Sequence, residues 1–109
     1  MQHLLSLPSP PTAVFTHNDV LALGAMHAIE NAGLKTPKDI SIVGYDDISS
    51  AAYLSPPLTT VRLAKRELGR EAGRIILGHL QASTETAFQT VTLPVELVIR
   101  ASTSAPRNR

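Results

Sequence analysis

The fold is decided by residues 13–47, which read AVFTHNDVLALGAMHAIENAGLKTPKDISIVGYDD. The run AVFTH at 13–17 is short and rich in strand-forming residues, and Asn18-Asp19 directly after it is a favoured helix start. Residues 20–31 then place apolar side chains at helical spacing, on more than one face of the helix. The apolar run at 40–45 is typical of a mostly buried strand. Together these signals predict an α/β fold that contains a β-α-β unit.

Two strands that are joined by a helix of this length lie parallel in one sheet, with a right-handed crossover. Asn18 follows the first predicted strand and Asp46 follows the second. Because parallel strands end at the same edge of a sheet, we expect both residues at the carboxyl edge, on backbones about 5 to 10 Å apart if the strands are neighbours. Open α/β sheets bind ligands at that edge. An amide and a carboxylate there predict a hydrogen-bonding site for a hydroxyl-rich or amide-bearing small molecule.

Each of these polar pairs also has a purely structural interpretation. Asn18-Asp19 at a strand-to-helix turn is suited to cap the helix, since both side chains can satisfy free backbone amides and favour the helix dipole. Asp46-Asp47 is suited in the same way to cap a short helix expected over residues 48–54, which Pro56-Pro57 stops. Both interpretations stay open at the level of the sequence.

Downstream of this unit, the pattern predicts a third strand or extended crossing segment at 59–63 and a long amphipathic helix at 64–80. The basic side chains on one helix face alternate with glutamates at pairing distance, which indicates a solvated surface. Residues 88–93 and 95–100 are typical of short strands broken by Pro94. The apolar helix face is expected to pack through Leu68, Ala72, Ile75, Ile76 and His79.

The two ends of the chain are expected to lack regular structure. Prolines at positions 8, 10 and 11 forbid a helix or a central strand around them, so residues 1–11 are predicted to be irregular. The Ser/Thr/Arg-rich C-terminal end is expected to fray, with residues 105–109 as its tail.

The composition excludes several classes of function. The 109 residues contain no cysteine, carry a formal charge of +1 and are 4% aromatic, so neither thiol chemistry nor a broad nucleic-acid surface is supported. The histidines have irregular spacing, and the usual metal, phosphate-loop, dinucleotide and nucleophile-elbow motifs are missing, so no catalytic residue, metal site or cofactor is predicted. The first dozen residues do not read as a secretory signal, and no apolar run reaches membrane-spanning length. We therefore expect a cytoplasmic protein that does not enter the membrane.

Three phrases in order carry a resemblance to a known family: HNDVLALGAM at 17–26, ISIVGYDD at 40–47 and PPLTTV at 56–61. With the GREAGRIIL helix and LPVELVIRAST downstream, the chain resembles the C-terminal part of the effector-binding core of the lactose repressor (LacI/GalR) family over about residues 12–104. The resemblance implies part of a periplasmic-binding-protein-like (type I) core that lacks its N-terminal portion. In this family two α/β subdomains enclose a sugar or another small effector.

The resemblance also implies roles for individual segments and residues. Residues 12–58 and 93–104 would belong to the C-terminal subdomain, and residues 59–92 to the N-terminal subdomain. Asn18 and Asp46 match family positions that hydrogen-bond the effector, with Tyr45 beside them. Many relatives carry a glutamine and a proline just after the VR of the crossing, where this chain has Leu63 and Ala64, so the identity of the ligand does not follow.

The matching family subdomain dimerises through the helix that corresponds to residues 22–29 and the short helix that corresponds to 48–54. This implies a subunit contact through Ala22, Met26 and Tyr53, with burial inside the monomer as the alternative. A homodimer or higher oligomer is expected. DNA would be bound only through a helix-turn-helix, and these 109 residues contain none.

The sequence therefore favours a non-enzymatic effector-binding and dimerisation part of a LacI-type transcription regulator. Two alternatives stay open. One is part of a periplasmic sugar-binding transport protein, which shares the ND and GxD phrases. The other, less favoured, is a receiver-like phosphoryl acceptor that binds magnesium at Asp46-Asp47, although no other strand end supplies a third aspartate.

Overall fold

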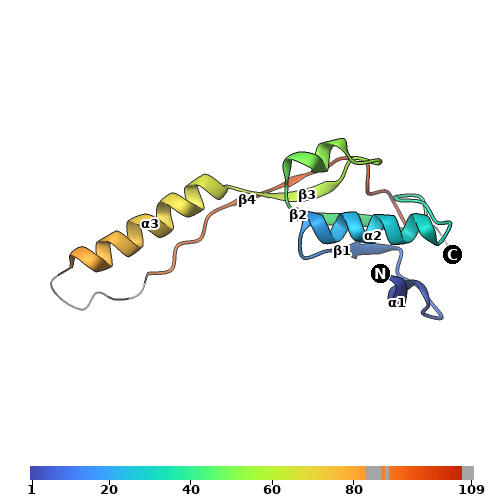
Figure 1. Ribbon diagram of the computed structural model, residues 1–109, viewed down its shortest axis with the longest axis horizontal. Helices are drawn as coiled ribbons and strands as arrows, with labels where there is room; N and C mark the ends of the chain where they lie inside the picture. The colour runs from blue at the N-terminus through green and yellow to red at the C-terminus, as the bar shows by residue number, and fades with distance from the viewer. Residues whose placement is uncertain (83–86, 88, 107–109) are drawn as a thin grey trace. The chain divides into compact units, whose positions relative to one another are not determined.

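The structure, a computed structural model, describes residues 1–82, 87 and 89–106. The chain forms two compact units, and Figure 1 shows the order of their elements. The first unit comprises Met1–Arg62 and Glu96–Arg109, and the second comprises Leu63–Val95. The assignment of the units to the two subdomains of the family stays a prediction.

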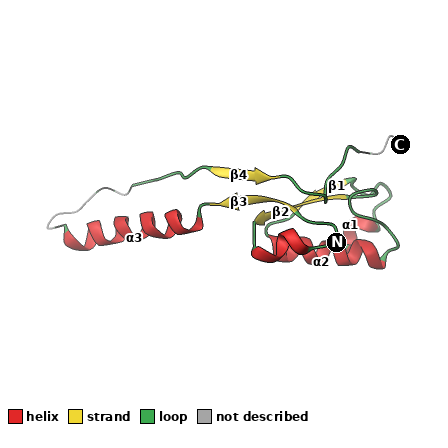
Figure 2. Cartoon of the chain, turned by 90° about the horizontal axis from the view of Figure 1, so that it is seen from above, coloured by secondary structure: helices red, strands yellow, loops and turns green. Residues whose placement is uncertain are grey.

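Four strands form one open sheet in the order β1-β2-β3-β4. The strands are β1 (Ala13–Phe15), β2 (Ser41–Asp46), β3 (Thr59–Leu63) and β4 (Val95–Val98). β2 lies between β1 and β3 and is parallel to both. Figure 2 shows β4 beside β3 with its arrow in the opposite direction, so the sheet is mixed. The predicted parallel β-α-β unit is confirmed.

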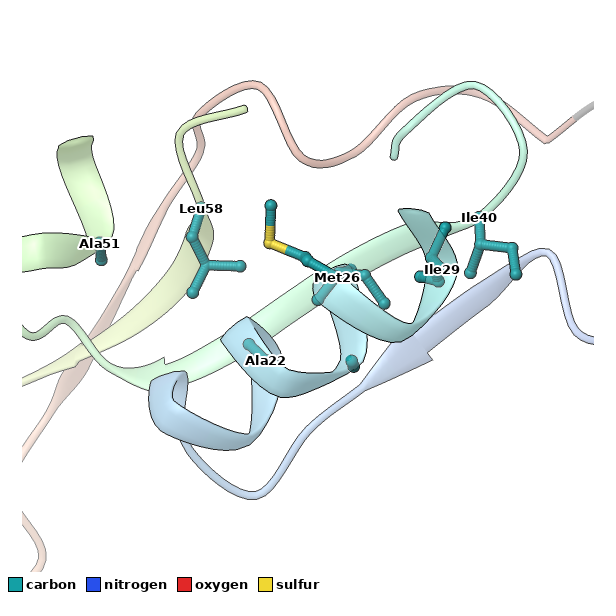
Figure 3. Packing of buried hydrophobic residues seen from close by; sticks show 8 residues of the cluster. Ala22, Met26, Ile29, Ile40, Ala51 and Leu58 are labelled. Atoms are coloured by element: carbon teal, nitrogen blue, oxygen red, sulfur yellow. The ribbon is translucent and has the colours of Figure 1, made fainter. Parts of the chain in front are cut away.

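Helix α2 (Asp19–Asn31) is the crossover between β1 and β2, and it packs on β2. Its buried residues are spaced by three and four positions, so they form one apolar stripe. Small alanines in this stripe let the helix approach the sheet closely, and the larger buried side chains each contribute about 1.5 to 3 kcal/mol. Figure 3 shows the resulting core, whose buried members are Ala22, Ala25, Met26, Ile29, Ile40, Ile42, Ala51 and Leu58.

Two short helical segments complete the first unit. The expected short helix after β2 is present as a 3-10 helix, η1 (Ser49–Tyr53), which contributes Ala51 to the core. At the N-terminus, Gln2–Leu5 form one helical turn, α1, so the prediction of irregular backbone throughout residues 1–11 is wrong there. The prolines begin only at position 8, and the preceding amides are free to close the turn, as the 3.1 Å bond from Leu5 N to Met1 O shows.

Ser102, three residues before the predicted frayed tail at 105–109, is fully buried. Residues 107–109 of that tail lie outside the described residues. β2 and β3 begin to pair at Val43 and Thr59, and Ser102 lies between the two strands just before that point. The Ile42 amide donates to the Ser102 carbonyl at 2.8 Å, and the Ser102 hydroxyl donates to the Ile42 carbonyl at 2.6 Å. The Thr59 amide donates to the same hydroxyl at 2.8 Å. The end of the chain therefore fills a gap in the hydrogen-bonding ladder.

The second unit contains helix α3 (Lys65–Gln81), whose bounds agree with the predicted helix within a residue. The prediction that one face of this helix packs is wrong, because no residue of α3 is buried and Leu68 is 52% exposed. Within the described part of this unit, only an extended segment accompanies the helix, so there is no sheet to cover its apolar face. The strand expected over 88–93 is likewise not formed by residues 89–93, and Phe88 lies outside the described residues.

Gly44 in β2 marks the closest approach between the sheet and α2. A Cβ atom at this position would overlap the Asp19 carboxylate oxygen Oδ1 and lie 2.9 Å from the Leu58 atom Cδ2. Both neighbours are buried, so neither can move aside into solvent. Only glycine leaves the room that the Asp19 side chain occupies.

We predict that Gly44→Ala lowers the free energy of unfolding by about 1 to 3 kcal/mol, because the added methyl group overpacks this contact. Urea unfolding followed by circular dichroism measures the change. Gly24→Ala is the matched control, because Gly24 lies on α2 with no atom within 4 Å of an added Cβ. The control is expected to be neutral or to stabilise the protein by up to about 1 kcal/mol. Equal stabilities of the two variants would contradict the prediction.

Candidate functional site

The predicted polar residues lie at the carboxyl edge of the sheet. β1 and β2 run parallel with Phe15 opposite Val43, and Asn18 and Asp46 each lie three residues beyond this pair. Asp46 is the last residue of β2, and Asn18 follows the short loop after β1, so both lie at the carboxyl ends of neighbouring strands. The parallel pairing on which the sheet-edge prediction depends is confirmed.

Asn18 is the N-cap of α2. Its backbone is extended, and its side-chain Oδ1 accepts a hydrogen bond of 2.8 Å from the Leu21 amide. The capping interpretation is therefore correct for Asn18. The cap uses only the carbonyl oxygen of the amide group, so the two N–H donors of the same side chain take no part in it.

Asp46 ends β2 with an unusual backbone conformation. Its φ angle is 114° and that of Asp47 is 49°, so two successive non-glycine residues lie in the left-handed region. The half-buried Asp46 carboxylate makes no hydrogen bond or ion pair with the described part of the chain. Tyr45 lies on the other face of the strand from Gly44, and its ring meets the Phe15 ring edge-on at a centroid distance of 6.5 Å.

Asp19, the first residue of α2, is fully buried, and both of its carboxylate oxygens are hydrogen-bonded. Oδ1 accepts from the Thr60 hydroxyl of β3 at 2.5 Å, and Oδ2 accepts from the Ile48 amide at 2.8 Å. Asp19 is therefore not the cap of its own helix. It ties α2 to β3 and to the turn that follows β2.

Asp47 is not a helix cap either. The N-cap position of η1 is Ile48, and it makes no side-chain capping bond. The Asp47 carboxylate instead accepts from two arginines, at 2.7 Å from Arg100 and at 2.6 Å from Arg62. Arg62 also contacts the exposed carboxylate of Glu96 at 3.1 Å. The capping interpretation of Asp46-Asp47 is thus wrong, since Asp47 is occupied by an ionic cluster.

The surroundings of Asp47 shift its pKa. Burial of the carboxyl group acts to raise the pKa, but the hydrogen bonds and positive charges of Arg100 and Arg62 outweigh burial, and the pKa of Asp47 lies below its usual value of 3.8. Arg100 is the more confined partner, because it is 17% exposed and also donates to the Leu58 carbonyl at 2.8 Å. Arg62 is 48% exposed, so water screens its charge more strongly.

The residues predicted for a subunit contact differ in exposure. Ala22 is fully buried and Met26 is 8% exposed, and both belong to the core of the first unit. The alternative of burial within the monomer is therefore correct for these two residues, which have almost no surface to offer a partner. Tyr53 on η1 is 87% exposed.

No group of three metal-ligating side chains occurs among the described residues. His27, one of the four histidines, contacts the Asn31 amide group at 3.1 Å on the same helix. The basic side chains of α3 are partly paired as expected, because Arg74 forms an ion pair with Glu71 one helical turn away.

In the part of the chain that the structure describes, no helix is long and apolar enough to cross a membrane.

An open α/β sheet with polar side chains beyond the carboxyl ends of its parallel strands is the architecture of periplasmic-binding-protein-like cores. The chain belongs to the periplasmic binding protein-like domain family, and the match to this family covers residues 1–103. The predicted resemblance to the effector-binding core of LacI-type regulators is also confirmed by the comparisons that follow.

The HTH-type transcriptional repressor CytR of Escherichia coli strain K12 is 46% identical over 105 residues, which cover 96% of this chain. The chain spans 30% of the length of that relative. A LacI family transcriptional regulator from Enterococcus faecium, solved with bound ribose, superposes with a TM-score of 0.79 at 37% identity, covering 98% of this chain and 38% of that one. A dimeric Lac repressor with an 11-residue C-terminal deletion superposes with a TM-score of 0.75 at 43% identity, covering 89% and 35%.

Sequence reasoning missed the residues that hold this edge together, namely Asp19, Gly44, Thr60, Arg100 and Ser102. Gly44 was the available signal, because a glycine inside an otherwise apolar strand indicates that another group approaches closely. Arg100 gave a second signal, as a cation at the end of an apolar run. Neither signal names the partner, which comes from a segment far away in the sequence.

We predict that Asp47→Asn lowers the free energy of unfolding at pH 7 by about 1 to 2 kcal/mol, mainly because Arg100 loses its charged acceptor. Because the folded-state pKa of Asp47 lies below 3.8, its stabilising contribution is present above that pH and is lost as the pH falls below it. The stability difference between the wild type and Asp47→Asn is therefore expected to shrink as the pH falls below 3.8, as measured by urea unfolding at several pH values.

Glu96→Gln is the control for this prediction, because it removes a 66% exposed carboxylate that pairs with the same Arg62. This variant is expected to unfold almost as the wild type does at every pH. A stability difference for Asp47→Asn that stays constant from pH 7 to pH 2.5 would show that the ionic cluster does not contribute as described.

Proposed function

We propose that this chain forms part of the effector-binding core of a LacI-type transcriptional regulator, and that its effector is a sugar or a related hydroxyl-rich small molecule. Asn18 and Asp46 are the residues proposed to bind it, with Tyr45 beside them. The observation that carries the proposal is the position of these two side chains beyond the ends of adjacent parallel strands. The named relatives, which are repressors and a regulator with bound ribose, support it.

The chemistry of the two side chains suits a polyol. The Asp46 carboxylate accepts hydrogen bonds, and a charged acceptor binds hydroxyl groups about twice as strongly as a neutral one. The Asn18 amide group retains two N–H donors after capping α2 with its oxygen. Neighbouring hydroxyls on a sugar ring both donate and accept, so one acceptor and one donor at the same edge match a pair of them.

Regulation follows from differential binding in this proposal. In the complete protein the effector would bind one arrangement of the two subdomains better than another, and this difference in affinity would bias the DNA-binding state. DNA would be contacted by a separate helix-turn-helix, in the cytoplasm. The part proposed here supplies ligand contacts and subunit contacts and performs no catalysis.

We propose in addition that the protein self-associates through the surface around Tyr53. Next to it in the chain, Leu54 lines a hollow of about 370 Å³, whose wall combines apolar residues such as Leu23 with charged ones such as Glu30 and Lys35. Leu23 is 46% exposed, so its apolar side chain can contact a second copy of the chain while the core stays folded. An exposed aromatic ring next to a hollow with both apolar and polar lining is suited to pair with a second copy of itself about a two-fold axis.

We predict that Asp46→Ala weakens the binding of D-ribose, used as the probe sugar, by about five- to a hundredfold, because a charged hydrogen-bond acceptor is lost. Isothermal titration calorimetry measures the affinity. Glu30→Ala is the control, since it removes an exposed carboxylate from the far end of α2 and leaves the carboxyl edge unchanged. Equal ribose affinities of wild type and Asp46→Ala would reject the proposed role of Asp46.

We predict that Tyr53→Asp weakens self-association, because a charge replaces the exposed ring at the proposed contact. Sedimentation equilibrium over a range of protein concentrations measures the effect. Leu80→Asp is the control, because Leu80 is an apolar residue of α3 with a similar exposure of 76%. The proposed contact is wrong if Tyr53→Asp associates as strongly as the wild type, or if Leu80→Asp has the larger effect.

A further inference from the structure

Asp19 places a carboxyl group in a fully buried position. Removing a carboxylate from water is unfavourable unless hydrogen bonds replace its hydration. Helix capping does not explain the burial, because Asn18 already caps α2. Both Asp19 oxygens are directed away from the helix, to the Thr60 hydroxyl and the Ile48 amide.

Ile48 belongs to the turn that carries Asp46, whereas Thr60 belongs to the neighbouring strand β3. Asp46 and Asp47 both have positive φ angles, and the left-handed region is unfavourable for a non-glycine residue. Such a turn relaxes to an ordinary conformation unless other interactions hold it. The Ile48 amide is held by Asp19, and the Asp47 amide makes a longer contact of 3.4 Å to the Thr60 hydroxyl.

The Thr60 hydroxyl is the link between these contacts. It donates to Asp19 Oδ1 and accepts from the Asp47 amide, so one side-chain atom of β3 connects the buried carboxylate with the strained turn. The hydroxyl is fully buried, and Gly44 provides the space in which it meets Asp19. Water therefore cannot reach the Thr60 hydroxyl to replace its hydrogen bond to Asp19 if that bond is lost.

We propose that Asp19 and Thr60 are positioning residues for ligand binding. They hold the turn at Asp46–Ile48 in its left-handed conformation and thereby direct the Asp46 carboxylate, which has no partner among the described residues, toward the ligand. This proposal rests on the function proposed for Asp46. It adds that the affinity for the ligand depends on two buried side chains that do not touch it.

The experiment combines two measurements on the same variants. Amide hydrogen exchange at Ile48, followed by NMR spectroscopy, reports the turn without any ligand. Titration calorimetry with D-ribose reports the binding site under conditions in which each variant is fully folded. Thr60→Val removes the hydroxyl at almost constant volume, and Thr60→Ser keeps it. Asp19→Asn replaces one carboxylate oxygen by an N–H donor. If the Asp19→Asn variant does not fold, the two Thr60 variants decide the test.

We expect Thr60→Val to speed exchange at Ile48 and to weaken ribose binding by about three- to tenfold, as the loss of one hydrogen bond predicts. Thr60→Ser should restore both values. Ser41→Ala is the control, since Ser41 is a buried hydroxyl residue at the opposite end of β2 that bonds Ser104. It should lower stability without changing ribose affinity.

The results separate this proposal from the function on which it rests. If Asp46→Ala weakens ribose binding but Thr60→Val leaves both the affinity and the Ile48 exchange unchanged, the positioning role is overturned and the proposed function stands. If Asp46→Ala has no effect on ribose binding, the proposed function fails, and the positioning role fails with it. A loss of affinity in Ser41→Ala equal to that in Thr60→Val would show that the effect comes from general destabilisation, which also overturns the proposal.

Discussion

The buried carboxylate of Asp19 is the interaction on which the carboxyl edge of the sheet depends. It belongs to α2, accepts from β3 through Thr60 and from the turn after β2 through Ile48, and needs a glycine at position 44 to fit. A buried charge that loses one partner is more costly than one that was never buried. These segments must therefore take their places together, and the edge is built as one cooperative arrangement.

Two chemically identical neighbours at this edge have opposite environments. Asp47 is enclosed by Arg62 and Arg100, which lower its pKa against the effect of burial, whereas the Asp46 carboxylate makes no hydrogen bond or ion pair with the described residues. Both residues lie in the turn with positive φ angles, and only the Asp47 side chain reaches the arginines. One aspartate thus ties the edge to the arginines of β3 and of the segment after β4, and the other is left for a ligand.

The elements of the fold were largely predictable from residues 13–81, because their signals are local. Apolar runs, helix-start residues and the 3.6-residue period located β1, α2, β2, β3 and α3 within one or two residues. What failed was packing. α3 has a clear apolar face that is not buried, and the stretch before Pro94 has strand-forming residues without a strand. Both failures have the same reason. A sequence pattern shows which face of a helix or strand is apolar, but it does not show whether another segment packs against that face.

The sequence by itself determined that two parallel strands joined by a helix bring Asn18 and Asp46 to one edge, because chain direction follows from connectivity and from the handedness of crossovers. Only the tertiary structure decided which polar groups at that edge remain available. Asp19 and Asp47 each read as a helix cap, and Ser102 gave no signal. All three are bound by residues 13 to 60 positions away. Such long-range hydrogen bonds have no local signal, since they depend on where separate segments meet in space.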